Sequence, residues 1–170
     1  WRMDEQSWNG SSNEVADSGT GGYPGTAASL STKPTTSIAA AAITGTPGTC
    51  RYGVFNRTNK DYIDVSSIPN LAGSGSTGFT VMGWIYVTNN ALTGQRIVAD
   101  DQNNGTGSWA LSIGDGGAGV LRFLYRQGAN FTLDTPGGSP LPSNQWLFVA
   151  VSVRLQAAGN SGATLYAYNT

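Results

Sequence analysis

Acidic side chains are the first residues to consider, because a pair of carboxylates can hydrolyse a glycosidic bond. That reaction needs two carboxyl groups about 5 to 10 Å apart, on either side of the bond. The chain has two glutamates, Glu5 and Glu14, and both precede residue 15. Asp61 and Asp64 are three residues apart, so on a strand their side chains point to opposite faces. The sequence also has no histidine and no Gly-Lys-Ser/Thr phosphate-binding loop. We therefore predict that the protein is not an enzyme.

Clustered oxygen ligands form a second kind of candidate site. Calcium prefers carboxylate and carbonyl oxygens, and the segment 100–105 is rich in both. Asp100, Asp101 and Asn103 are therefore candidate calcium ligands, and calcium is the one cofactor that we expect. The alternative is that these residues are ordinary turn formers in contact with water. Cys50 is the one cysteine; we expect it to be a small buried hydrophobic residue, and zinc, haem and iron–sulfur clusters lack ligands.

Exposed aromatic side chains beside polar groups would serve carbohydrate binding. The candidates are Trp8, Trp109, Tyr125 and Phe131. Trp8 lies in a polar loop, 7–12, and is predicted to be exposed. Trp109 alternates with Leu111 and Ile113, which favours the core over a ligand site.

Composition and charge limit the class of protein. At 170 residues the chain is predicted to be a single domain, 1–170. Only 11% of the residues are charged and 24 are glycine, which suits short strands, polar loops and a secreted or surface protein. The net charge of −1 and the scattered basic residues argue against nucleic acid as a partner. There is no run of 18 apolar residues, so no membrane span is predicted. Because the chain starts at Trp1, we expect a mature, trimmed or partial chain.

Two apolar segments are expected to form the centre of the fold. Phe79–Val87 and Trp146–Val153 are rich in β-branched and aromatic residues on both faces, which indicates buried strands that pair with each other. Trp84 and Trp146 lie in these strands and are predicted to be in the core.

Shorter strands are expected on either side of this pair. Strands 50–55 and 61–65 are predicted to form a hairpin across residues 56–60, with Tyr62 facing away from Ile63 and Val65. The other expected strands cover 1–5, 38–43, 96–99, 109–113, 120–125, 130–134 and 164–168. About eleven short strands with frequent turn signals predict an all-β fold, a two-sheet antiparallel sandwich or jelly roll.

Six sequence motifs occur in a consistent order along the chain. They are Arg2–Glu5, Asp17–Ala27, Tyr52–Asn56, Asp61–Val65, Phe79–Trp84 and Gln145–Val151. Together they resemble the bacterial laminin-G-like domains of the concanavalin A-like jelly-roll superfamily. More narrowly, the chain is similar to the domain of MshQ-like proteins of the mannose-sensitive haemagglutinin pilus system.

The resemblance implies further features of this chain. It implies a bacterial protein at the cell surface or outside the cell, and it adds Asp17 to the candidate calcium ligands. Ser108 stands near the position where eukaryotic laminin-G domains have an aspartate. The Glu-x-Asp-x-x-Glu motif of the glucanases in the superfamily is absent.

The resemblance also implies a missing part of the fold. Laminin-G-like domains of this kind continue beyond a strand like 164–168, so we expect the chain to lack its last strand or strands. Identical or other chains would then complete an open sheet edge. In some relatives, the cysteine at the position of Cys50 is expected to form a disulfide with a cysteine near the position of Gln6. This sequence lacks that disulfide, because residue 6 is glutamine.

The function expected from these observations is non-catalytic recognition. The protein would be an extracellular adhesion module that binds glycan or a surface protein, associated with a pilus or another surface filament. The alternative is a structural subunit of a fibre or envelope assembly that binds no soluble ligand.

Overall fold

The computed structural model describes residues 1–39, 51–65, 68–69, 71, 76–100, 108–127, 129–136, 139–155 and 162–169. The chain divides into two compact units, Trp1–Pro69 and Asn70–Thr170, and each is described by itself. The prediction of one domain over 1–170 stays a prediction. Within the described residues no helix is long and apolar enough to span a membrane. Cys50, most of the predicted strand 38–43, Asp101 and Asn103 lie outside the described residues.

The unit Trp1–Pro69 contains two short antiparallel strand pairs. Strand β1 (Thr26–Ala28) pairs with β4 (Tyr62–Asp64), and β2 (Thr35–Ser37) pairs with β3 (Tyr52–Val54). Its small core consists of Trp8, Val15 and Ala27, with Met3 and Ile63 packed against them. Residues 1–5 were predicted to be a strand and form none.

The predicted hairpin between the strands at 50–55 and 61–65 was wrong. Between β3 and β4 the chain forms the 3₁₀ helix η1 (Arg57–Asn59). The Asn56 side chain caps this helix by accepting a hydrogen bond from the Thr58 N–H, and the Asp61 carboxylate accepts one from the Asn56 N–H. These bonds favour a capped helical turn over a hairpin turn, so β3 and β4 each pair with an earlier strand. The expected directions of Tyr62 and Ile63 are confirmed, since Tyr62 is exposed and Ile63 packs on the core.

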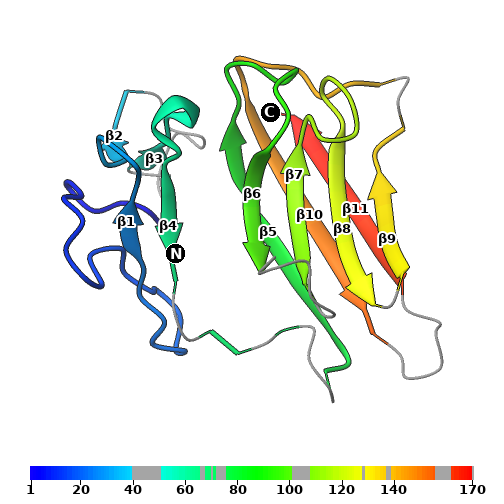
Figure 1. Ribbon diagram of the computed structural model, residues 1–170, viewed down its shortest axis with the longest axis horizontal. Helices are drawn as coiled ribbons and strands as arrows, with labels where there is room; N and C mark the ends of the chain where they lie inside the picture. The colour runs from blue at the N-terminus through cyan, green and yellow to red at the C-terminus, as the bar shows by residue number, and fades with distance from the viewer. Residues whose placement is uncertain are drawn as a thin grey trace. The chain divides into compact units, whose positions relative to one another are not determined.

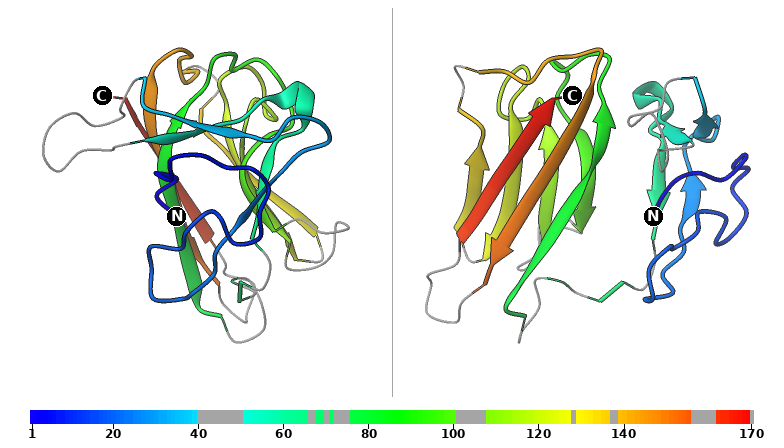
Figure 2. Two further views of the ribbon diagram at one scale, coloured as in Figure 1. Left: turned by 90° about the vertical axis from the view of Figure 1, so that its left-hand side faces the viewer. Right: turned by 180° about the vertical axis from the view of Figure 1, so that it is seen from behind.

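The unit Asn70–Thr170 is an antiparallel β-sandwich, as predicted (Figures 1 and 2). One sheet has the strand order β11-β10-β5, and the other has the order β6-β7-β8-β9. The strands are β5 (Gly78–Tyr86), β6 (Gln95–Asp100), β7 (Trp109–Ile113), β8 (Leu121–Gln127), β9 (Ala129–Asp134), β10 (Trp146–Arg154) and β11 (Gly162–Asn169). The two predicted central strands do pair, with Trp146 opposite Tyr86 and Val153 opposite Phe79.

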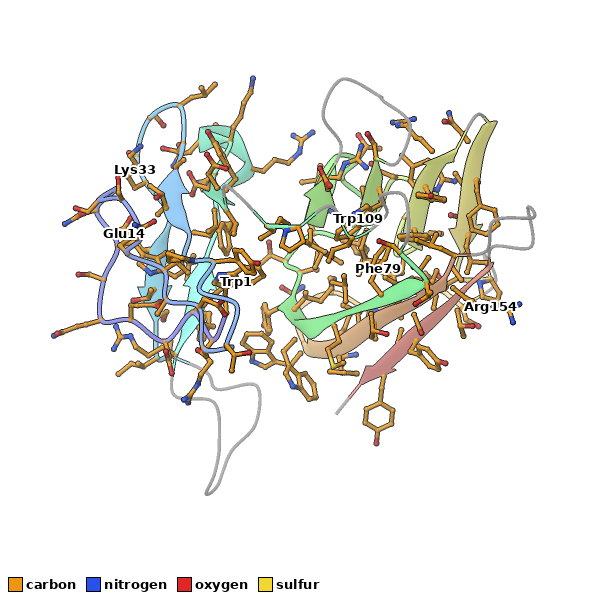
Figure 3. All side chains as sticks on the ribbon, turned by 90° about the horizontal axis from the view of Figure 1, so that it is seen from below. Trp1, Glu14, Lys33, Phe79, Trp109 and Arg154 are labelled. Atoms are coloured by element: carbon orange, nitrogen blue, oxygen red, sulfur yellow. The ribbon has the colours of Figure 1, made fainter. Side chains whose placement is uncertain are left out.

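The core of the sandwich lies between the two sheets. Alternate residues of β7, β8 and β10 supply its buried side chains, as the period of two in a strand requires. They are Trp109, Leu111, Leu121, Phe123, Tyr125, Leu147, Val149, Val151 and Val153. Phe79 of β5 approaches Trp109 of β7 with ring centroids 4.9 Å apart, and Figure 3 shows the two labelled residues side by side between the sheets. A register shift between Arg96 and Val98 lets both Ile97 and Val98 contact this core.

Candidate functional site

The outer face of the three-stranded sheet carries a concentration of aromatic side chains. Because side chains alternate along a strand, the residues between the core residues of β5, β10 and β11 point away from the core. Cross-strand register aligns them in rows: Trp84, Phe148 and Tyr168 form one row, and Tyr86 lies opposite Trp146 in the next. We call this surface the aromatic face and define it by Met82, Trp84, Tyr86, Trp146, Phe148, Ala150, Tyr166 and Tyr168.

The rings of the aromatic face combine exposure with fixed packing. Tyr168 is 68% exposed and Met82 62%, while Tyr86 and Tyr166 are also exposed. Trp84 and Phe148 pack edge to face, with ring centroids 5.5 Å apart and planes inclined at 62°. Tyr86 and Trp146 repeat this geometry at 5.5 Å and 69°. Rings that pack in this way hold one another in position, so these two pairs are ordered before a ligand arrives.

The prediction that Trp84 and Trp146 are core residues was wrong. Both side chains are partly exposed, and neither belongs to the core between the sheets. The strands are apolar on both faces, but only one face of each contacts the core of the sandwich. The second face is apolar because it carries the aromatic rows.

Trp8, predicted to be exposed, is buried, with 6% of its surface accessible. It packs with Val15 and Ala27, and its ring centroid lies 6.1 Å from that of Phe55. Its Nε1–H donates to Glu5 at 3.0 Å, which allows a tryptophan in a polar loop to be buried. Trp8 therefore presents no surface for a ligand.

The other three aromatic candidates lie on the four-stranded sheet. Trp109 is 1% exposed, which confirms the core interpretation, and Tyr125 is buried beside it. The prediction of Tyr125 as a ligand contact was therefore wrong, because its side chain faces the interior. Phe131 of β9 is 41% exposed, but it lies on the other sheet and is not part of the aromatic face.

Both glutamates bind backbone amides of nearby loops. Glu14 accepts hydrogen bonds from Asn9 N–H at 2.6 Å, Gly10 N–H at 2.7 Å and Ala27 N–H at 3.3 Å. Glu5 accepts from Ala16 N–H at 2.7 Å in addition to the Trp8 indole. The two carboxylates therefore hold the loops of the Trp1–Pro69 unit, a role in which they stabilise structure.

Asp17 has a similar local role, which bears on the predicted calcium site. Its two carboxylate oxygens accept hydrogen bonds from Tyr23 N–H and Gly19 N–H, each at 2.8 Å. These bonds stabilise the charged form and lower the pKa of Asp17 below its ordinary value. Asp17 therefore caps this loop, and calcium binding at Asp17 stays a prediction.

The remaining calcium candidates are only partly described. Asp100 ends β6, whereas Asp101 and Asn103 lie outside the described residues. Among the residues that the structure describes, no three acidic, histidine or cysteine side chains gather as a metal site. Calcium at segment 100–103 stays a prediction.

Charged side chains gather instead on the outer face of the four-stranded sheet. Arg122 binds Asp134 through two hydrogen bonds of 2.7 Å, which lower the pKa of Asp134. Arg96 lies 3.6 Å from Asp115. Burial alone would raise the pKa of Asp115, but the Gly94 N–H bond, the Ser112 side chain and the arginine charges outweigh it and leave this pKa below its ordinary value. In these two pairs the charges of the aspartates and arginines offset one another.

Comparison with known proteins gives one family. A laminin G-type family model, described as the concanavalin A-like lectin/glucanases superfamily, matches residues 57–167. The match includes η1 and every strand from β4 to β10, together with most of β11. Comparison with curated proteins and with solved structures gives no significant match.

Proposed function

Since the chain belongs to the laminin G-like domains of the concanavalin A-like superfamily, we propose that it is a non-catalytic recognition module that binds glycan through its aromatic face. Domains of this family often bind carbohydrates or proteins and are typically extracellular. The observation that carries the proposal is the exposure of aromatic rows on an ordered sheet. Exposed apolar patches on a folded protein mark interaction sites.

Sugar rings have apolar C–H faces and polar hydroxyl rims. The aromatic face has ring surfaces for the first and the hydroxyls of Tyr86, Tyr166 and Tyr168 for the second. Tyrosine and tryptophan present rigid contact area at a low entropic cost. This combination favours a glycan over a purely apolar ligand.

The acidic residues support a role without catalysis. Glu5 and Glu14 accept backbone hydrogen bonds in the Trp1–Pro69 unit, and the aromatic face has no acidic side chain. A glycosidase would need two carboxyl groups on either side of the bound sugar. We propose that the protein binds its glycan and releases it unchanged.

The resemblance to MshQ-like proteins supports a place on or beside a bacterial surface filament. In that setting the module would attach the filament or cell to a glycan-coated surface. The second candidate function is a structural subunit of a fibre. It is favoured by β5 and β11, each of which has one hydrogen-bonded neighbour within the described residues and therefore leaves one edge to pair with another chain.

Affinity electrophoresis through gels that contain soluble polysaccharides tests the proposed function. We expect at least one polysaccharide to retard the wild-type chain, and the double variant Tyr166→Ala/Tyr168→Ala to lose most of that retardation. Tyr62→Ala, which removes an exposed tyrosine from β4, is the matched control and should migrate as wild type. No increase in reducing ends is expected in the retarding polysaccharide. Retardation that is equal in the double variant would contradict the assignment to the aromatic face.

A further inference from the structure

The aromatic face contains no charged side chain. Three successive rows, Tyr86–Trp146, Trp84–Phe148–Tyr168 and Met82–Ala150–Tyr166, consist of aromatic, methionine and alanine residues. Among the described residues of this unit, the charged groups lie outside these rows, such as the Arg122–Asp134 pair on the opposite sheet. A ligand on the aromatic rows therefore meets no fixed charge.

The next row toward the far end of the sheet is polar but still uncharged. It consists of Thr80, Ser152 and Thr164, and the Thr80 hydroxyl donates to the Ser152 hydroxyl at 3.3 Å. The first ionisable group along β10 is Arg154, which follows this row. It lies four residues from Ala150 of the nearest aromatic row, or about 13 Å along the strand. At this end of the sheet, hydroxyl groups therefore separate the aromatic rows from Arg154.

The platform is regular and larger than a single sugar ring. Pairing of β5, β10 and β11 runs without a register shift, so the side chains form regular rows. Three strands span about 10 Å between the outer two, and the rows from Tyr86 to Met82 extend about 13 Å along β5. A surface of this shape can contact several linked sugars at once, whereas a single sugar would leave most rings uncovered.

We infer that the aromatic face takes an uncharged polysaccharide, bound over several consecutive sugar units; this inference rests on the proposed function. Sulfate or carboxylate groups placed on the aromatic rows would lose water without gaining a cation, which is unfavourable. Acidic glycans are therefore selected against, although their sugar rings have the same shape. The binding is expected to be insensitive to salt, because no ion pair contributes to it.

Matched polymers test this inference on the intact wild-type chain. Hydroxyethyl cellulose and dextran are compared with carboxymethyl cellulose and dextran sulfate, in 50 mM and 500 mM sodium chloride. Other neutral and acidic polysaccharide pairs are added in the same format. We expect the neutral member of a retarding pair to bind about tenfold or more tightly than its acidic partner. We also expect the monosaccharide to compete at least tenfold less well than an oligosaccharide of the same sugar.

The possible outcomes separate the inference from the proposed function. Equal or stronger binding of the acidic member, or full competition by the monosaccharide, overturns the inference while the glycan-binding function stands. Absence of binding to every polymer overturns the proposed function and the inference together.

Sedimentation of wild type and Tyr166→Ala/Tyr168→Ala tests a different occupant of the face. A wild-type dimer that the double variant dissociates would assign the aromatic face to a second copy of the chain. Protection of the Tyr166 and Tyr168 rings from iodination in a ligand-free monomer would show that other residues of the chain cover the aromatic face. Either result overturns the inference, and a monomer with reactive tyrosines supports it.

Discussion

Trp84 of β5 and Phe148 of β10 are direct cross-strand neighbours, and their rings meet edge to face at 5.5 Å on the side of the sheet that points away from the core. The pair links stability to the proposed function, since it both joins β5 to the central strand β10 and forms part of the middle row of the aromatic face. Replacing either ring should therefore affect folding as well as binding.

A double-mutant cycle measures how much the interaction between these two rings contributes to stability. We expect Trp84→Ala and Phe148→Ala each to lower the free energy of unfolding, with a coupling of about 0.5–1.5 kcal/mol between them. Urea unfolding of the four proteins gives the coupling. Phe131→Ala, on β9 of the other sheet, serves as the control partner and should be additive with Trp84→Ala. Additivity in the Trp84–Phe148 cycle as well would contradict the ring interaction.

Glu14 is predicted to stabilise the loops of the first unit. Glu14→Ala leaves the Asn9 and Gly10 amides without their acceptor, which should cost about 1–3 kcal/mol locally. Hydrogen exchange at these amides should accelerate, while Glu14→Gln, which keeps one acceptor oxygen, should show a smaller effect. Exchange rates like those of wild type in Glu14→Ala would contradict this role.

The strands of the Asn70–Thr170 unit were easier to predict from the sequence than those of the Trp1–Pro69 unit, and the reason is physical. The strand at 109–113 was predicted with its observed bounds and β10 to within one residue, because long alternating apolar runs have few alternatives. β1 and β2 were missed, since three residues of threonine, alanine and serine carry no such pattern. Their pairing is decided by residues far along the chain, which local patterns do not reveal.

The candidate site was only partly predictable. Alternation in Phe79–Val87 separates Trp84 and Tyr86 from the core residues, but two apolar faces suggested burial on both sides. The pairing register, which the sequence does not specify, shows that Phe148 and Tyr168 continue the same row. The burial of Trp8 could have been predicted from Glu5, because this acceptor three residues earlier satisfies the indole N–H.

Gly83 offers a stabilising substitution at the centre of β5. Its φ lies outside the left-handed region, and a Cβ built there meets no heavy atom within 4 Å beyond its chain neighbours. Gly83→Ala should therefore raise the free energy of unfolding by about 0.4–1 kcal/mol, since alanine has less freedom in the unfolded chain. Gly114→Ala is the contrasting variant: with φ of 90° and Leu92 O in the way, it should destabilise. A loss of stability in Gly83→Ala would contradict the open space beside β5.

Thermal melting with and without calcium is expected to give different results for variants at Asp17 and in the segment 100–103. Because Asp17 caps a loop, Asp17→Ala should lower the melting temperature by the same amount with and without millimolar calcium. If the predicted site at Asp100, Asp101 and Asn103 binds calcium, the ion raises the melting temperature of wild type but not of Asp101→Asn. Absence of a calcium shift in wild type would contradict the predicted site.

The Arg122–Asp134 pair predicts an acid-dependent change in stability. The hydrogen bonds and charge of Arg122 lower the pKa of Asp134 in the folded state, so folding favours the ionised carboxylate. Its contribution is therefore fully present above the ordinary aspartate pKa of about 3.9. It is lost as pH falls through the lower folded-state value. Since the pair is partly exposed, we expect it to contribute less than about 1 kcal/mol to the free energy of unfolding.

Urea unfolding between pH 2 and 7 should show a smaller loss of stability in acid for Asp134→Asn than for wild type. Arg122→Lys, which keeps the charge but loses the two-bond geometry, should be intermediate. An unchanged acid decline in Asp134→Asn would contradict the predicted contribution of this pair.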